Sequence, residues 1–207
     1  GTVINMVLTT MMAYPLSRPH LTFRKFYNVL ILITMFFSGG LIPTFLTVRN
    51  LGLYDTVWAV VLPGAISTWN LIIMRTFFMN LPVELEESAQ LDGANDLTIF
   101  SRIILPLSKA SIATITLFYA VSHWNNWFNA MIYFKSSKSY PLQTILRSIV
   151  INNEMSEEMQ VDEVIDSVSA EGIKYSTLVV SMVPMLVVYP FIQKYFVKGV
   201  MIGGVKG

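Results

Sequence analysis

Residues 87–106 read ESAQLDGANDLTIFSRIILP, a polar stretch between two long apolar segments. Its fixed points follow the spacing Glu-x-Ala-x3-Gly-x9-Ile-x-Leu-Pro, from Glu87 to Pro106. The apolar segments on either side indicate only that the chain is a membrane protein. The polar stretch between them is therefore the part of the sequence that decides which fold and which class of membrane protein to expect.

The composition is that of a chain in contact with lipid. Of the 207 residues, 54% are hydrophobic and 13% are charged, whereas an ordinary soluble domain has about 25% charged residues. The net charge of +1 gives no reason to expect a nucleic-acid partner. There is no cysteine, and His20 and His123 stand alone, so we expect no disulfide, thiol nucleophile or metal site.

Five apolar segments are candidates for crossing a membrane. Four of them, 26–48, 56–79, 107–134 and 173–197, exceed the roughly 20 residues that a bilayer requires. The first, 1–17, is shorter and has neither an initiating Met nor a basic leader, so we expect that the natural N-terminus is missing and that the chain starts inside a helix. Helix breakers predict kinks that either aid packing or line a water-filled path; they are Gly39, Gly40, Pro43, Pro63, Gly64, Pro184 and Pro190.

The basic residues indicate which loops face the cytoplasm. If the 17–25 loop, the 84–105 loop and the C-terminus are cytoplasmic, nine of the 14 Lys and Arg residues lie inside and five lie outside. This bias obeys the positive-inside rule. The external 135–172 connection then has three basic and seven acidic residues, a net charge of 3 − 7 = −4.

The 82–106 stretch has the signals of two short helices joined by a tight turn. Pro82 can occupy the first turn of the first helix, where its missing N–H costs nothing, and three glutamates follow near the positive end of that helix. Gly93 can turn the chain with a positive φ, and Asp96 is the expected N-cap of the second helix. Pro106 predicts a kink where this helix meets the next apolar segment. On periodicity alone, an amphipathic hairpin on the lipid surface fits equally well.

The spacing from Glu87 to Pro106 resembles the EAA loop of the inner-membrane permeases of ABC importers. The one departure is Ser88, where a second alanine is usual, and serine is also small. Residues 13–18, 124–128 and 203–207 resemble the corresponding parts of carbohydrate-importing, maltose-type permeases. The resemblance implies an all-α membrane protein with the type I ABC importer permease fold, with about five transmembrane helices in this chain and the first of six missing.

In that family the loop is a cytoplasmic coupling loop that docks into a separate ATPase. The resemblance implies that Glu87 faces a basic residue of the ATPase, and that the tail 198–207 reaches the interface between two ATPase subunits. The implied ATPase-coupling residues are Glu87, Ser88, Ala89, Leu91, Asp92, Gly93, Ala94, Ile103, Leu105 and Pro106, and the implied tail contacts are Gly203, Gly204, Val205 and Lys206. The chain has no G-x-x-x-x-G-K-[ST] motif, so we expect no cofactor and no enzymatic activity here, with ATP and magnesium bound by the partner ATPase.

The polar residues near position 125 form the candidate substrate path: Trp124, Asn125, Asn126, Trp127 and Asn129. Polar groups within a membrane segment usually face a cavity or another helix, and aromatic rings with amides suit sugars. The alternative is that they are interfacial aromatics and amides that join helices. In the 135–172 connection, apolar residues at helical spacing predict a short outer helix. The resemblance implies that it helps to receive a binding protein; the alternative is a solvated acidic loop.

The residues and the resemblance together predict a single permease domain, 1–207, in a bacterial plasma membrane. We expect a subunit of an ATP-driven ABC importer that takes up oligosaccharides or polysaccharide breakdown products. The expected partners are a second permease subunit, an ATPase dimer, an extracellular or periplasmic solute-binding protein, the oligosaccharide and membrane lipid, but no nucleic acid. A permease for amino acids or another small solute is the alternative. An ion-driven secondary transporter is disfavoured because every Asp and Glu lies in a connection or at its edge.

Overall fold

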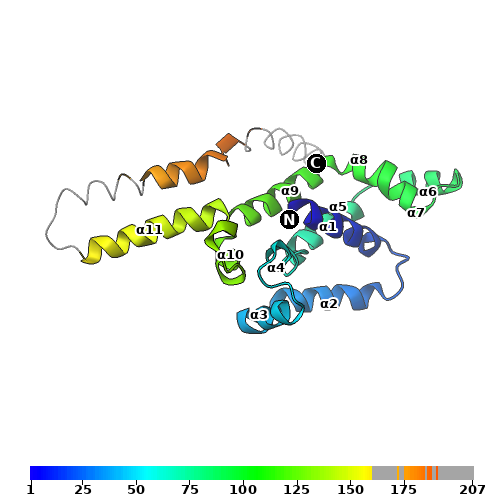
Figure 1. Cartoon of the computed structure of the whole chain (residues 1–207). Helices are drawn as coiled ribbons and strands as arrows, with labels where there is room; N and C mark the ends of the chain where they lie inside the picture. Colours follow the sequence, from blue (N-terminus) through cyan, green and yellow to red (C-terminus); the bar gives the residue numbers. More distant parts are fainter. Residues whose placement is uncertain (160–171, 173–174, 185, 188–189, 191–207) are drawn as a thin grey trace. The chain divides into compact units, whose positions relative to one another are not determined.

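The computed structural model describes residues 1–159, 172, 175–184, 186–187 and 190, and all regular elements in these residues are helices (Figure 1). Its internal contacts divide the chain into two compact units. Of the described residues, the first unit contains 1–44 and 64–120, and the second contains 45–63 and those from 121 onward. The predicted tail contacts at 203–206 lie outside the described residues.

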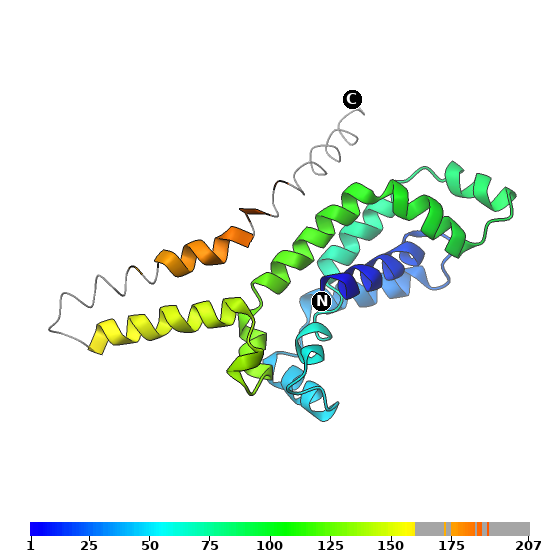
Figure 2. The same ribbon diagram turned by 45° about the horizontal axis from the view of Figure 1, so that its top comes forward.

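Three helices form the centre of the first unit: α1 (Thr2–Ser17), α2 (Arg24–Phe36) and α5 (Thr68–Met79). They lie side by side in Figure 2, and among the helices that the structure describes α1 packs most extensively against α5. Large apolar side chains on α2 remain exposed, among them Phe26, Ile33 and Phe36, as expected of a surface that lipid or another protein covers. The buried core also includes residues from the 96–120 stretch; its members are Met6, Ala13, Leu16, Ile31, Leu71, Met74, Phe78, Ile99, Ile104, Ile115 and Tyr119.

Buried polar side chains bridge the break in the chain before α5. Asn5 donates its side-chain amide to the carbonyl oxygens of Gly64, at 2.9 Å, and Ala65, at 3.0 Å. The Tyr119 hydroxyl accepts from the backbone N–H of Ser67 at 3.0 Å. The break predicted from the Pro-Gly pair at 63–64 is therefore present, and neighbouring helices satisfy backbone groups that it frees.

Three of the predicted membrane segments are interrupted helices instead of continuous ones, and one of them is segment 56–79, with its break at Pro63 and Gly64 before α5. Segment 26–48 divides between α2 and α3 (Leu41–Asn50), and Gly40 in the break has a φ of +84°. Segment 107–134 divides between α9 (Lys109–Trp124) and α10 (Trp127–Tyr133). Within the described residues no single helix is both long and apolar enough to cross a bilayer, whereas the bent pairs 24–50 and 96–124 meet that test when the two helices of each pair are taken together.

The second unit is built from the end of α3, α4 (Val57–Val61), α10, the short 3-10 helix η2 (Ser137–Ser139) and α11 (Leu142–Met159). Val48, Ala59 and Tyr133 form a small buried core. The turn at Asp55 is attached to the end of α10, because its N–H donates to the Tyr133 carbonyl at 3.0 Å and its carboxylate accepts from the Lys135 N–H at 3.0 Å. The helix predicted in the 135–172 connection is present as α11.

Candidate functional site

The 82–106 stretch folds as two helices joined by a short turn. The first is α6 (Glu84–Leu91); the second begins as α7 (Asp96–Ile99) and continues through the π-helix η1 (Phe100–Ile104) into α8 (Leu105–Leu107). Pro82 precedes α6 instead of lying in its first turn, since Val83 is the N-cap. Asp96 is also not the N-cap expected from the sequence. The side-chain oxygen of Asn95 accepts from the Thr98 N–H at 2.8 Å, which makes Asp96 the first helical residue.

Gly93 ends α6 in the left-handed region, with a φ of +81°. The Ala94 N–H donates to the Ala89 carbonyl at 2.9 Å, and the Gly93 N–H donates to the Gln90 carbonyl at 3.0 Å. These two bonds are those of a Schellman motif, which satisfies the last carbonyls of a helix. A Cβ at position 93 would meet no atom within 4 Å, so glycine is required for its conformation and not for space. The turn predicted at Gly93 is confirmed.

The predicted coupling residues of α6 and its turn divide between two faces. The outer face comprises Glu87, Ser88, Leu91 and Asp92, which are all exposed, and Leu91 is 90% exposed. Ala89 and Ala94 are half-buried and pack against the core of the first unit. The outer residues are therefore available to a partner, while the two alanines hold the loop against the helices.

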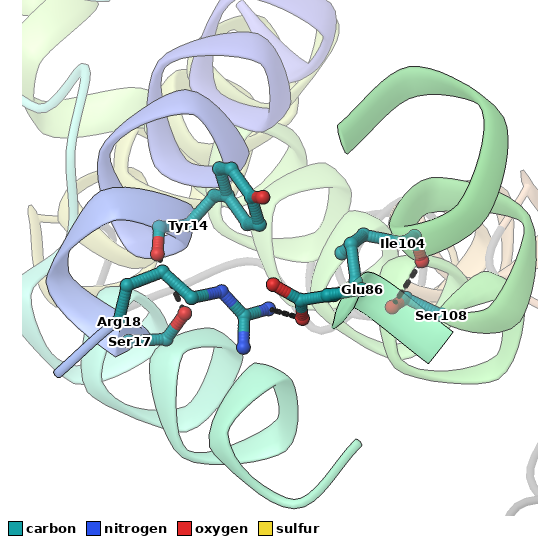
Figure 3. A network of polar contacts seen from close by, with 6 residues as sticks. All are labelled: Tyr14, Ser17, Arg18, Glu86, Ile104 and Ser108. Carbon is teal, nitrogen blue, oxygen red and sulfur yellow. Dashed lines mark hydrogen bonds and ion pairs between the residues drawn. The ribbon is translucent and has the colours of Figure 1, made fainter. Parts of the chain in front are cut away.

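The loop joins α9 through an irregular helix. Pro106 has no N–H for the carbonyl four residues earlier, and the Leu105 N–H bonds to the carbonyl of Phe100, five residues earlier. The chain then bends by 81° between Leu107 and Lys109, two residues beyond the kink expected at Pro106. At the bend, the buried Ser108 hydroxyl donates to the Ile104 carbonyl at 2.7 Å (Figure 3). Of the remaining predicted coupling residues, Ile103 and Leu105 are half-buried and Pro106 is exposed.

An ion pair attaches α6 to the end of α1. Arg18 Nη2 lies 2.6 Å from Glu86 Oε1 (Figure 3), and only 17% of the Arg18 side chain and 7% of the Glu86 side chain are exposed. The Arg18 guanidinium also lies over the ring of Tyr14, 4.8 Å from its centroid. That ring contacts Phe100, with the centroids 5.1 Å apart. Elements α1, α6 and η1 therefore meet at this pair.

The two adjacent glutamates of α6 have opposite surroundings. Glu87 is exposed, whereas burial raises the pKa of the Glu86 carboxyl above its ordinary value. The Arg18 guanidinium opposes this rise in pKa, and the Asp96 carboxylate adds to it. From the sequence, Glu86 was assigned to the helix dipole alone. The pairing was missed because Arg18 and Glu86 are far apart in the chain, and a single sequence holds no signal for such a contact.

A cavity of about 660 Å³ adjoins the ion pair. The end of α1, the loop after it, α6 and α7 form its walls. Leu97 and Phe100 supply apolar surface, and the polar lining includes Arg18, His20, Glu86, Glu87 and Gln90. Because this space lies between α6 and the end of α1, the ion pair bridges a gap that close packing does not fill.

The candidate substrate-path residues gather at the break between α9 and α10. Trp124 ends α9, and its indole N–H donates to the Ser181 carbonyl at 3.3 Å. Asn125 and Asn126 form the break, which the sequence does not predict because it contains neither glycine nor proline. Trp127 begins α10, and Asn129 on the same helix is half-buried. The described residues thus place all five on one short segment of the second unit.

Broken apolar helices and an exposed, glycine-capped loop are the features expected of the membrane permeases that an ABC importer uses. The chain belongs to the family described as "Binding-protein-dependent transport system inner membrane component", which matches residues 1–202. The resemblance found from the EAA loop is thereby confirmed.

Individual proteins similar to this chain also point to this family. The chain is 50% identical over 208 residues to the polygalacturonan/rhamnogalacturonan transport system permease protein YtcP of Bacillus subtilis, covering 100% of this chain and 73% of YtcP. It is 48% identical over 208 residues to protein LplC of the same organism, covering 100% of this chain and 70% of LplC. A crystal structure of a bacterial ABC transporter involved in the import of the acidic polysaccharide alginate superposes with a TM-score of 0.80 at 35% identity, covering 94% of this chain and 71% of that one. The fold is therefore the type I ABC permease fold.

Proposed function

We propose that this chain is a membrane-spanning subunit of an ATP-driven importer that takes up oligosaccharides released from polysaccharides. The observation that supports this most strongly is 50% identity, over the whole chain, to a permease named for polygalacturonan and rhamnogalacturonan transport. The described carboxylates support a transporter driven by a separate ATPase: the one buried carboxylate among them, Glu86, lies in the coupling loop and not within a long apolar segment. An ion-driven mechanism would need such a group along the path.

The proposed topology places five segments in the bacterial plasma membrane. The 82–106 coupling loop and the 198–207 tail lie in the cytoplasm, and the 135–172 connection lies outside. The excess of Lys and Arg on the cytoplasmic side supports this arrangement. So do the hydrogen bonds from Asn5 to the broken backbone at Gly64 and Ala65, because a broken helix in a membrane requires such partners.

The proposed partners are a second permease subunit, a pair of ATPase subunits that bind ATP and magnesium, and an external solute-binding protein. The outer face of α6, led by Glu87 and Leu91, contacts the ATPase. When the ATPases close on ATP, α6 moves with them. Glu86 transmits this movement to α1 through its ion pair with Arg18, 2.6 Å away. The remaining predicted coupling residues shape the turn or anchor it.

A pair of matched variants tests the coupling role. Glu84 and Glu87 are both exposed carboxylates on α6, one turn apart, so Glu84→Gln controls for loss of charge. If Glu87 pairs with a basic residue of the ATPase, Glu87→Gln removes a charge-assisted hydrogen bond of about 1.5–3 kcal/mol. We expect at least tenfold weaker retention of the ATPase, and slower uptake into proteoliposomes that contain the complete complex. Equal behaviour of the two variants would contradict the assignment of Glu87.

A further inference from the structure

Charge is segregated along the chain on either side of residue 153. Between Asp96 and Glu154 the sequence has no acidic residue, and the three basic residues that follow α10 are Lys135, Lys138 and Arg147. The net negative charge of the 135–172 connection therefore arises entirely from residues beyond position 153. The part of α11 before position 154 contains one charged residue, Arg147.

Arg147 is held against an aromatic ring. Its guanidinium carbon lies 3.8 Å from the centroid of Trp127, and Thr144, on the same helix, donates its hydroxyl to the Trp127 carbonyl at 3.3 Å. The cation–π contact orients the plane of the guanidinium and leaves the N–H donors along its edge. No carboxylate among the side chains that the structure describes pairs with Arg147.

Groups that can bond sugar hydroxyls lie on the same segment as Trp127. Asn125 is exposed, and Asn126 and Asn129 are half-buried. Within the described residues, the side-chain amides of these three residues have no hydrogen-bond partner. An amide that offers both donors and an acceptor can bond to the hydroxyl groups of any sugar, whether neutral or acidic. The amides alone therefore give no selectivity for charge.

We propose that Arg147, stacked on Trp127, binds the carboxylate of an anionic sugar residue and thereby favours acidic oligosaccharides over neutral ones. This inference rests on the proposed function and narrows its substrate class. A guanidinium matches a carboxylate with two parallel bonds, which are stronger than bonds between neutral groups. One face of the Trp127 ring then supports the arginine. From the sequence, we expected aromatic rings of this segment to stack on sugar instead. Two of the relatives are named for acidic polysaccharides, which agrees with this selectivity.

The test compares an acidic ligand with its neutral form. Proteoliposomes containing the permease with its partner permease, ATPase and binding protein are supplied with oligogalacturonides or with the same oligomers as methyl esters. For Arg147→Gln we expect half-saturating oligogalacturonide concentrations to rise by about tenfold, as loss of one charge-assisted pair implies, with uptake of the esters unchanged. Arg147→Lys keeps the charge without the planar fork and should give an intermediate rise. Every sample contains the same binding protein. Its own preference for acid or ester therefore cancels when the half-saturating concentration of a variant is divided by that of the wild type.

Lys138→Gln is the matched control, since Lys138 is a cation of the same connection that lies over no aromatic ring in the described part of the chain. Unchanged uptake of both ligands by Lys138→Gln supports a specific role for Arg147. If Arg147→Gln impairs acid and ester equally, Arg147 is only structural and the inference is wrong. If it impairs neither, Arg147 does not bind substrate. If the wild-type complex imports other solutes but neither ligand, the proposed oligosaccharide function fails as well.

Discussion

Breaking the pair between Arg18 and Glu86 should separate ATP hydrolysis from transport. Removing one partner of a buried ion pair typically destabilises a protein by about 3–5 kcal/mol, because the other charge is left buried and unpaired. The Glu86 side chain is 7% exposed and the Arg18 side chain 17% exposed, so the pair is close to the buried ion pairs for which this range holds. We therefore expect Arg18→Gln to cost about 3 kcal/mol in the attachment of α6 to α1. Glu86→Gln should cost less, since the more exposed Arg18 is the charge that it strands.

The effect should depend on pH in a definite direction. Burial already raises the pKa of Glu86, and Arg18 is the group that opposes this rise, so Arg18→Gln should raise that pKa further. A carboxyl whose folded pKa exceeds its unfolded value of about 4.3 stabilises the fold below that value. This stability is lost as the pH rises through the folded pKa. The defect of Arg18→Gln should therefore be small at acidic pH and grow toward neutral pH.

The assay is the ratio of substrate imported to ATP hydrolysed in proteoliposomes, with the melting temperature of the purified complex measured alongside it. Arg18→Gln should keep ATP hydrolysis and lower the ratio, whereas the double variant Arg18→Gln with Glu86→Gln should recover part of the loss, with a coupling energy of about 1–3 kcal/mol. If the single variants retain the wild-type ratio and melting temperature, or if their effects simply add, the pair does not transmit movement between α6 and α1.

Three further predictions concern the positions around the loop and the broken helix. Gly93→Ala should destabilise the turn by about 1–2 kcal/mol, because a residue with a Cβ is strained in the left-handed region. Gly93→Asn should destabilise it by less, because asparagine tolerates that conformation and the space around position 93 is open to its side chain. Thermal unfolding of the complex measures the difference, and equal effects would contradict it. Asn95→Ala should lower the free energy of unfolding by about 1 kcal/mol, because it removes the cap to the Thr98 N–H, while Asp96→Asn should be nearly neutral. A larger loss from Asp96→Asn than from Asn95→Ala would show that Asp96 is the cap. Asn5→Leu should destabilise the fold by about 1–3 kcal/mol for each of the Gly64 and Ala65 carbonyls that it leaves without a donor. Asn5→Gln should retain part of the stability. A fully stable Asn5→Leu would show that other groups satisfy the carbonyls of that break.

The parts of the loop that local chemistry determines could be predicted from the sequence. Gly93 is an example, because a positive φ is a demand on one residue, and so is the break at Pro63 and Gly64. The N-cap prediction at Asp96 was wrong by one residue, because Asn95 and Asp96 are both good caps and only the structure shows which oxygen reaches Thr98. The bend after Leu107, displaced from Pro106, depends on a π-helical turn for which the sequence has no separate signal.

Contacts between distant positions could not be predicted. The pairing of Arg18 with Glu86 and the stacking of Arg147 on Trp127 both require knowledge of which helices meet. The break at Asn125 and Asn126 contains neither glycine nor proline, and the adjacent asparagines are a weaker local signal for a turn. The residues of the candidate substrate path were chosen by residue type, and Arg147, which lies over Trp127, was not among them.

The exposure of two leucines on the 82–106 loop has a consequence for the stability of the subunit before it assembles with its partners. Leu91 is 90% exposed and Leu97 is 72% exposed, and Leu91 is the last residue of α6, just before the Schellman motif at Gly93. Burying a leucine contributes about 1.5–3 kcal/mol, so if these leucines dock on an ATPase, as proposed, assembly adds stability that the isolated chain lacks. On the proposed function, an unassembled subunit would expose these two apolar side chains, and chaperones or quality-control proteases could distinguish it from the assembled importer by them.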